Sequence, residues 1–109
     1  MKVCALVPAF NEARAVGDVV RGAIAHVDRV LVVDDGSTDG TGDVAAAAGA
    51  EVMRLDANSG KGTAIRAGLS RILQGDVTHV LFMDGDMQHR PQEIPALLAE
   101  AERSGAAMV

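Results

Sequence analysis

The sequence predicts an α/β domain, a three-layer sandwich in which helices cover both faces of a mainly parallel sheet. Three observations support this prediction. Four apolar runs are short enough for buried strands, helical patterns separate them, and the links between runs and helices hold only a few residues. Parallel strands need crossover connections, so right-handed crossovers are expected. The predicted strands are Val3 to Val7, Val30 to Val33, Glu51 to Leu55 and His79 to Met83.

Helices are predicted between these strands. The longer patterns place apolar residues three or four positions apart, so one face of each helix would cover the sheet. Between the first two strands these residues are Val16, Val19, Val20, Ala23, Ile24 and Val27, and between the last two they are Ile65, Leu69, Ile72 and Leu73. A shorter helix is predicted from Thr41 to Ala48, with Asp39 or Thr38 as its cap and Gly49 as its stop.

A last helix is predicted to begin near Pro91 or Pro95, because proline is tolerated in a first turn. Its inward positions would be Ile94, Leu97, Leu98 and Ala101. Residues 106–109 look like the start of a fifth strand, so the fold is expected to be truncated after this helix. No repeat or linker divides the chain, and residues 1–109 are predicted to form one domain.

Composition and charge disfavour several classes of protein. With a formal net charge of −5 and scattered lysines and arginines, the chain lacks the basic surface typical of nucleic-acid binding. Cys4 is the only cysteine and lies in the first apolar run, which excludes an internal disulfide and favours a reducing compartment. No apolar stretch approaches the ~20 residues of a membrane-spanning helix. We therefore expect a cytoplasmic protein, with any membrane association peripheral.

Polar clusters follow each of the four predicted strands, at Pro8 to Glu12, Asp34 to Asp39, Asp56 to Lys61 and Asp84 to His89. In parallel sheets, ligands bind beyond the carboxyl ends of the strands, so one site could collect all four clusters. Two familiar phosphate-binding loops are missing: no G-x-x-x-x-G-K-[ST] occurs, and Pro8 to Asn11 stands where a dinucleotide fold has G-x-G-x-x-G. These patterns favour an acid-rich nucleotide site.

Asp84 and Asp86 are the main candidates for metal binding. On an extended backbone they lie on the same side, so both carboxylates can face one hard cation such as Mg²⁺ or Mn²⁺. Gln88 and His89 add candidate ligands or orienting groups. The alternative is a solvated Asp-Gly turn, since two aspartates at this spacing are common.

Other polar residues have both a ligand-binding and a structural interpretation. Asp35 could contact a base or ribose or belong to a turn, whereas Asp39 is favoured as a helix cap. Lys61 begins a helix, where a cation opposes the dipole. A ligand phosphate or the carboxylate cluster would resolve that conflict, and an exposed loop lysine is the alternative. Glu12 could be an early-helix glutamate or reach a nucleotide from the opposite wall.

Taken together and in order, four segments resemble the family 2 glycosyltransferases: Val7 to Glu12, Val32 to Thr41, Asn58 to Gly62 and Asp84 to His89. The resemblance covers nearly the whole chain. The Gln-His pair after the two aspartates is most similar to the dolichyl-phosphate mannose synthase branch and its bacterial polyprenyl-phosphate relatives. The resemblance implies the nucleotide-sugar-binding part of a Rossmann-like GT-A fold.

The resemblance also implies roles for individual residues. Pro8, Phe10 and Glu12 would line one side of the nucleotide, and Val33 and Asp35 would hold base and ribose. Around the diphosphate and the metal it places Asp84, Gly85, Asp86 and Gln88, with Asp86 the strongest metal candidate. Phe10 stands where the family often has Tyr. Gly85 stands where Ala is usual, a change that the backbone should tolerate.

The implied activity is transfer of a sugar from GDP-mannose or a UDP-sugar to an acceptor such as a polyprenyl phosphate. Mg²⁺ or Mn²⁺ would neutralise the charge that grows on the leaving diphosphate, and inversion at the sugar carbon is expected of the family. One alternative is a sugar-nucleotidyltransferase, which normally begins with a Gly-rich basic loop that this chain lacks. Another is a catalytically incomplete module that binds nucleotide or self-associates through an open sheet edge.

Overall fold

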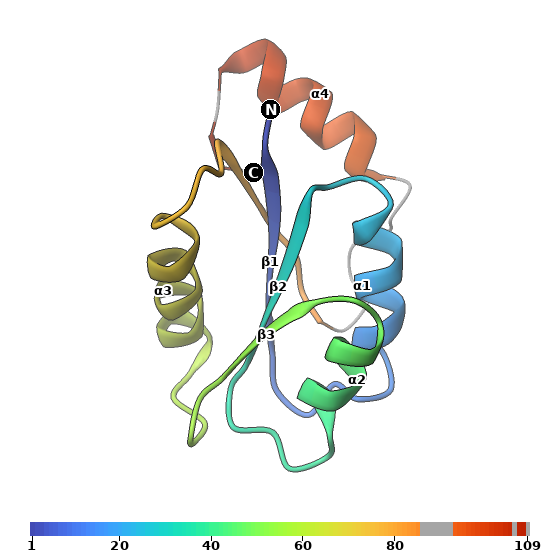
Figure 1. Cartoon of the computed structure of the whole chain (residues 1–109), viewed down its shortest axis with the longest axis vertical. Helices are drawn as coiled ribbons and strands as arrows, with labels where there is room; N and C mark the ends of the chain where they lie inside the picture. The colour runs from blue at the N-terminus through green and yellow to red at the C-terminus, as the bar shows by residue number, and fades with distance from the viewer. Residues whose placement is uncertain (86–92, 106, 109) are drawn as a thin grey trace.

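A computed structural model describes residues 1–85, 93–105, 107 and 108. Strands and helices alternate along the described chain, as the sequence predicts (Figure 1). They are β1 (Val3–Ala9), α1 (Val16–Ile24), β2 (Arg29–Asp34), α2 (Thr41–Ala47), β3 (Glu51–Arg54), α3 (Lys61–Ile72), β4 (His79–Phe82) and α4 (Ile94–Ser104). The predicted α/β class is therefore confirmed.

The four strands form one parallel sheet in the order β3-β2-β1-β4. β1 is central, and its Ala5 pairs with Val30 of β2 on one side and Leu81 of β4 on the other. The chain therefore builds outward from β1 to β3 and then returns to the opposite side of β1. Such a reversal opens a crevice at the carboxyl ends of the two strands that flank it, here β1 and β4.

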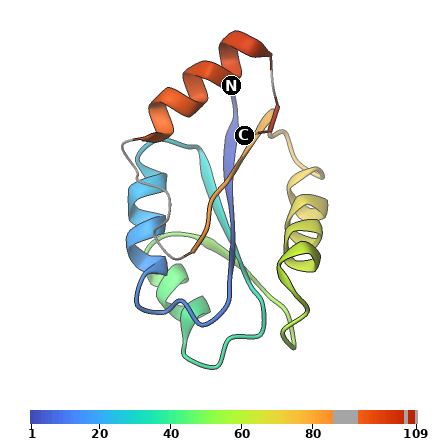
Figure 2. The same cartoon turned by 180° about the vertical axis from the view of Figure 1, so that it is seen from behind.

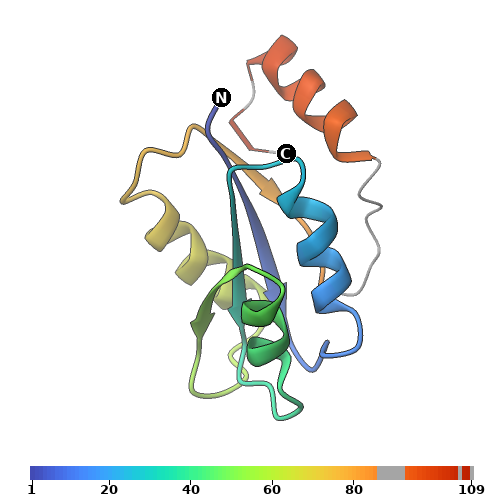
Figure 3. The same ribbon diagram turned by 45° about the vertical axis from the view of Figure 1, so that its right-hand side comes forward.

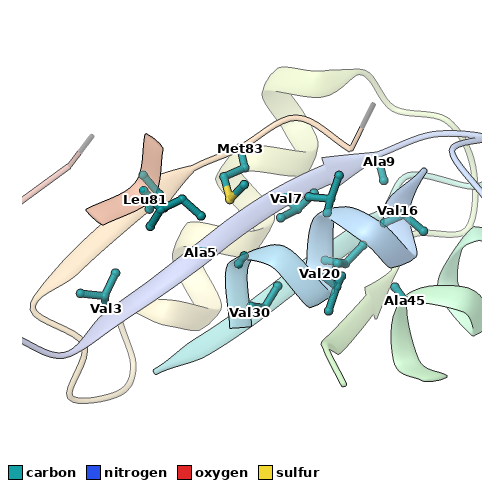
Figure 4. Close-up of a cluster of buried hydrophobic side chains, with 14 of the residues drawn as sticks. Val3, Ala5, Val7, Ala9, Val16, Val20, Val30, Ala45, Leu81 and Met83 are labelled. Carbon is teal, nitrogen blue, oxygen red and sulfur yellow. The ribbon is translucent and has the colours of Figure 1, made fainter. Parts of the chain in front are cut away.

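Helices cover both faces of this sheet, which confirms the predicted three layers. Side chains alternate across a strand, so Val3, Ala5, Val7 and Ala9 of β1 share one hydrophobic cluster with buried residues of α1, α2 and α4. Cys4 and Leu6 point to the other face and pack with buried residues of α3. Figures 1, 2 and 3 show α1 and α2 on one side of the sheet and α3 on the other. Figure 4 shows the β1 side chains packed against α1.

Three apolar residues predicted to face inward are instead exposed. The exposed fractions are 43% for Ile24, 72% for Leu73 and 37% for Leu97. Each is the sequence neighbour of a residue that is buried against the sheet, namely Ala23, Ile72 and Leu98. Neighbours on a helix point about 100° apart, so only one member of each pair reaches the core. α1 also ends at Ile24, so Val27 lies outside it.

The predicted helix boundaries are close to those observed. The N-cap residue of α2 is Gly40 rather than Asp39 or Thr38, although Asp39 Oδ1 accepts the Thr41 N–H at 3.1 Å. Gly49 follows the end of α2 with φ 109°, as its predicted role as a stop requires. In α4 a proline occupies the first turn, at Pro95. The alternative start at Pro91 lies outside the described residues.

The two edges of the sheet differ. β3 forms one edge, while beside β4 the Val80 N–H donates to the Ala107 carbonyl at 2.8 Å and Val80 forms a parallel bridge with Met108. Ala107 and Met108 therefore lie where the fifth strand is expected, whereas residues 106 and 109 are not described. Self-association through an edge stays a prediction.

Cys4 is fully buried, and burial is the main cause that raises the pKa of its thiol. Cys4 is therefore a small apolar residue of the core. Within the described ranges, no helix has the length and apolar character needed to cross a membrane.

Candidate functional site

A cavity of about 270 Å³ lies at the carboxyl end of the sheet, in the crevice between β1 and β4. Its size is just below the ~300–1,000 Å³ typical of small-molecule pockets. The lining residues come from the end of β1, from the segments after β1, β2, β3 and β4, and from the start of α3, so all four polar clusters reach it. They are Pro8, Ala9, Phe10, Glu12, Asp35, Asn58, Lys61, Ala64, Asp84 and Gly85.

The loop after β1 forms one wall, and hydrogen bonds to the loop after β2 hold it in place. Asn11 adopts a left-handed conformation with φ 52°. Its N–H donates to Ser37 Oγ at 2.9 Å and its Oδ1 accepts the Thr38 N–H at 2.9 Å. The next residue, Glu12, donates its N–H to Thr41 Oγ1 at 3.0 Å. These hydrogen bonds hold the backbone directly after Phe10, whose exposed fraction is 42%.

Asp39 also holds the loop after β1 in place through hydrogen bonds. Its Oδ2 accepts the Ala13 N–H at 3.2 Å, and its Oδ1 accepts from both the hydroxyl and the N–H of Thr41. The hydroxyl of Thr41 is the main cause that lowers the pKa of Asp39, and Thr41 itself is fully buried. Asp39 is thus not the N-cap that the sequence predicts; its role is structural all the same, because it joins the loop after β1 to the start of α2.

Asp35 connects the loop after β2 to the loop before α3. Its Oδ1 accepts the Ser59 N–H at 2.9 Å and the Ser59 hydroxyl at 2.7 Å, and its Oδ2 accepts the Gly60 N–H at 3.0 Å. Burial raises the pKa of Asp35, but the three hydrogen bonds together lower it by a larger amount, so the pKa lies below its ordinary value. The side chain is 4% exposed at the cavity wall, so Asp35 both lines the cavity and holds the first turn of α3.

Lys61 and Asp84 form an ion pair at the cavity. Lys61 is the first residue of α3, and Asp84 follows β4. The Asp84 carboxylate is an anion beside a lysine at a helix N-terminus, as one of the interpretations of Lys61 expects. The lysine side chain is 63% exposed and that of Asp84 is 22% exposed.

The segment after β4 is in close contact with the loop after β1. β4 ends at Phe82, one residue earlier than predicted, and Gly85 lies in a turn. Pairing with β1 stops at Leu6 and Phe82, so the regular strand does not reach Gly85. The expected placement of Asp84 and Asp86 on one side of an extended backbone includes Asp86, which lies outside the described residues. An alanine Cβ at Gly85 would lie 3.1 Å from Ala9 Cβ, so alanine fits only after a small shift.

The structure brings seven of the predicted site residues together: Pro8, Phe10, Glu12, Asp35, Lys61, Asp84 and Gly85. Val33 is elsewhere, since its side chain is fully buried in the cluster under α3 and does not line the cavity. Asp86 and Gln88, with His89, lie outside the described residues. Within the described part of the chain, no group of three His, Cys, Asp or Glu side chains could hold a metal ion.

Sequence analysis missed three lining residues, namely Ala9, Asn58 and Ala64. Ala9 and Asn58 lie inside polar clusters that were predicted to form the site, so their position could have been predicted. Their small or neutral side chains give no chemical signal of their own. Ala64 lies one turn after Gly60, whose carbonyl accepts its N–H at 3.0 Å. Its place on the buried face of α3 follows from helical periodicity.

The fold and the site together define a class: a parallel α/β domain with an acid-rich ligand cavity at its topological switch point. A family model described as Glycosyl transferase family 2 matches residues 4–109. The chain therefore belongs to glycosyl transferase family 2, as its motifs indicate. This assignment favours the transferase over the sugar-nucleotidyltransferase alternative.

Two relatives that match most of this chain are named as transferases. Glycosyltransferase AglJ of Haloferax volcanii is 38% identical over 97 residues, which cover 88% of this chain and 31% of that protein. Undecaprenyl-phosphate 4-deoxy-4-formamido-L-arabinose transferase of Salmonella paratyphi A is 31% identical over 113 residues, covering 93% of this chain and 34% of that protein. The chain thus spans about a third of the length of these relatives.

Solved structures of GT-A glycosyltransferases share the fold. Mannosyl-3-phosphoglycerate synthase from Rubrobacter xylanophilus superimposes with a TM-score of 0.78 at 34% identity, over 93% of this chain and 36% of that one. Glucosyl-3-phosphoglycerate synthase from Mycobacterium tuberculosis gives 0.76 at 28% identity, over 90% of this chain and 38% of that one. The latter structure contains Mn²⁺, uridine diphosphate and glucosyl-3-phosphoglycerate.

Proposed function

We propose that this chain is the nucleotide-sugar-binding part of a metal-dependent glycosyltransferase. The observation that carries the proposal is the cavity between β1 and β4, where seven residues assigned from four separate motifs meet. A similar domain in glucosyl-3-phosphoglycerate synthase, 28% identical, has been solved with Mn²⁺ and uridine diphosphate. Pro8, Phe10 and Glu12 would line the nucleotide on one side, with Asp35 on the adjoining wall.

Among the residues that line the cavity, Asp84 suits a divalent metal, and the other candidate ligands lie outside the described residues. Asp84 lies at the cavity and already holds a positive group, the ammonium of Lys61. Its carboxylate oxygens are ligands that Mg²⁺ and Mn²⁺ accept, and we assign Asp86 and Gln88 as further candidate ligands. When bound, the metal would neutralise the negative charge that develops on the departing diphosphate.

The remaining chemistry is positioning. During transfer the bond from sugar C1 to the diphosphate oxygen breaks, its electron pair leaves with the diphosphate, and an acceptor oxygen bonds to C1. Attack from the opposite face would invert the anomeric centre. The loop that carries Phe10 and Glu12 is held by hydrogen bonds from its backbone N–H groups to the hydroxyls of Ser37 and Thr41. It would therefore hold the nucleotide-sugar donor in place for this attack.

A polyprenyl phosphate is the acceptor that we favour, because one relative is an undecaprenyl-phosphate transferase. The acceptor phosphate is already ionised, so it needs no strong general base. Such an acceptor would hold the protein peripherally at the cytoplasmic face of a membrane. GDP-mannose and UDP-sugars are both retained as donors, and the less favoured alternative is a catalytically incomplete module that only binds nucleotide.

Calorimetry tests the proposal directly. The chain is titrated with GDP, UDP, GDP-mannose and UDP-glucose, with Mg²⁺ or Mn²⁺ and again with chelator. We expect one nucleotide to bind in a metal-dependent manner, and Asp84→Asn or Asp86→Ala to weaken that binding at least about tenfold. Asp76→Asn is the matched control, since Asp76 is an exposed aspartate that pairs with Lys2 away from the cavity. Metal-independent binding, or none by a folded chain, would refute the proposal.

A further inference from the structure

Asn11, in the loop after β1, has an unusual backbone conformation. Among the non-glycine residues that the structure describes, it alone has a positive φ, 52°. Asparagine adopts this left-handed conformation more readily than most residues that carry a side chain. Its neighbours Phe10 and Glu12 both line the cavity, whereas Asn11 does not. The left-handed turn therefore lies between two residues of the cavity wall without itself reaching the cavity.

The Asn11 side chain contacts the loop after β2 instead. Its Oδ1 accepts the Thr38 N–H at 2.9 Å, and the Asn11 N–H donates to Ser37 Oγ at 2.9 Å. These contacts join residues that lie 26 and 27 positions apart in sequence. Because both the backbone and the side chain of one residue are bonded to the neighbouring loop, Asn11 is fixed in orientation as well as in position.

The next two residues are held in a similar way. The Glu12 N–H donates to Thr41 Oγ1 at 3.0 Å, and the Ala13 N–H donates to Asp39 Oδ2 at 3.2 Å. Three successive backbone N–H groups of the loop after β1 therefore donate to side chains of the loop after β2 and of the first residue of α2. These side chains determine the path that the loop after β1 follows.

This path decides where Phe10 and Glu12 lie. The Phe10 side chain is 42% exposed, so packing against the rest of the protein holds it only in part. A loop that is free to move must be ordered when a ligand binds, and the entropy lost in that ordering weakens binding. A loop that is already held by hydrogen bonds avoids this loss. The contacts of Asn11 should therefore raise the affinity for a ligand that Asn11 does not touch.

We infer that Asn11 is a positioning residue, which fixes Phe10 and Glu12 at the cavity wall before a nucleotide binds. The inference rests on the proposed function, because it takes these two residues as one side of the nucleotide site. Two properties of Asn11 carry the effect, namely its left-handed backbone and its Oδ1 acceptor. Removing either should weaken nucleotide binding through the loop.

The test separates the two properties by substitution. Asn11→Asp keeps the acceptor and tolerates the left-handed backbone, Asn11→Gly keeps only the backbone, and Asn11→Ala keeps neither. UDP and GDP are titrated into each chain in saturating Mn²⁺ and about 0.3 M salt, which screens the charge that aspartate adds. For the nucleotide that the wild type binds, we expect the affinity to fall about three- to tenfold in Asn11→Gly and more than about tenfold in Asn11→Ala. In Asn11→Asp it should stay within about twofold of the wild type.

Asp28→Ala is the matched control. Asp28 also holds backbone with its side chain, since its Oδ2 accepts the Val3 N–H at 2.7 Å, but this contact lies at the start of β1, at the other end of the strand. We expect Asp28→Ala to be less stable in urea unfolding and to keep the wild-type affinity for nucleotide. The control thus shows whether lost stability alone weakens binding.

Amide hydrogen exchange follows the loop itself. The N–H groups of Glu12 and Thr38 are hydrogen-bonded between the two loops, so their exchange reports whether the loops stay together. In Asn11→Gly we expect both to exchange faster than in the wild type. Bound nucleotide should then slow their exchange more in Asn11→Gly than in the wild type, because the variant orders its loop only when the ligand binds.

The outcomes separate this inference from the proposed function. If the wild type binds nucleotide and Asn11→Gly binds it equally tightly, the inference is wrong and the proposed function stands. Equal losses in Asn11→Gly and Asn11→Asp would also overturn the inference, because the acceptor would then not matter. If the folded wild type binds no nucleotide under any condition, the proposed function fails, and the inference fails with it. Glycine adopts the left-handed backbone without strain, so the test does not depend on Asn11→Ala being folded.

Discussion

The contact between Asp35 and the loop before α3 allows a quantitative test of how the cavity is built. Three donors converge on this one carboxylate: the N–H and hydroxyl of Ser59 and the N–H of Gly60. In Asp35→Asn the shape is kept, but one carboxylate oxygen becomes an NH₂ group. If the amide oxygen faces Ser59, the amide nitrogen faces the Gly60 N–H. Both groups are donors, so no hydrogen bond forms between them.

The expected magnitude follows from these bonds. A hydrogen bond to a charged group contributes about 1.5–3 kcal/mol, and the variant loses the one from Gly60. The two Ser59 bonds become neutral and fall to roughly 1 kcal/mol each. The variant also no longer buries a charge, which offsets part of the loss. We therefore expect the free energy of unfolding of Asp35→Asn to decrease by about 2–3 kcal/mol.

Urea unfolding of the chain and its variants measures this difference. Ser59→Ala removes only the hydroxyl donor to the charged carboxylate and should cost about 1.5–3 kcal/mol. The double variant should cost less than the sum of the two single variants, because Asp35→Asn already weakens the hydrogen bond from the Ser59 hydroxyl that Ser59→Ala removes. If Asp35→Asn stays within about 0.5 kcal/mol of the wild type, or if the two changes simply add, the carboxylate does not hold this loop.

Two further predictions concern the glycines around the loop after β2 and the carboxylates whose pKa values are lowered in the folded state. Gly36 and Gly40 have φ values of 78° and 85°, so alanine at either costs about 1–2 kcal/mol in backbone strain, but a Cβ at Gly36 would also lie 2.5 Å from backbone atoms of Ala57 and Asn58. Gly36→Ala should therefore destabilise the chain by about 2 kcal/mol more than Gly40→Ala in thermal unfolding, and equal losses would contradict the close approach. The folded state lowers the pKa of Asp35 and, through a hydrogen bond from Arg29, that of Glu51. The stability that these carboxylates contribute is present above their unfolded pKa values and is lost as the pH falls through the folded ones. The unfolding free energy should thus decrease below about pH 4.5, less steeply in Asp35→Asn, and parallel curves for both proteins would rule out the contribution of Asp35.

Much of the fold could be predicted because its signals are local. Four short apolar runs and the patterns between them gave all four strands and all four helices to within a few residues. The clearest errors concern helix faces, at Ile24, Leu73 and Leu97. In each case two adjacent apolar residues compete for one inward position, and the sheet, not the sequence pattern, decides which is buried.

The sequence predicted which residues lie at the site better than it predicted which of them contact one another. Parallel topology sends every strand's carboxyl end to the same edge, so the four polar clusters were expected to meet there. Among the predicted site residues that the structure describes, Val33 is the exception, because β2 continues through Val33 to Asp34 and the alternation of the strand turns the Val33 side chain into the core.

The sequence by itself determined the strand–helix alternation, the aliphatic core, the family and most of the residues around the cavity, because these depend on residue type and on spacing along the chain. Tertiary structure decided which polar groups pair. Asp35 meets Ser59 across 24 residues, and Asp84 meets Lys61 across 23. Such pairs depend on the order β3-β2-β1-β4 and on the placement of α3, neither of which spacing along a chain can specify.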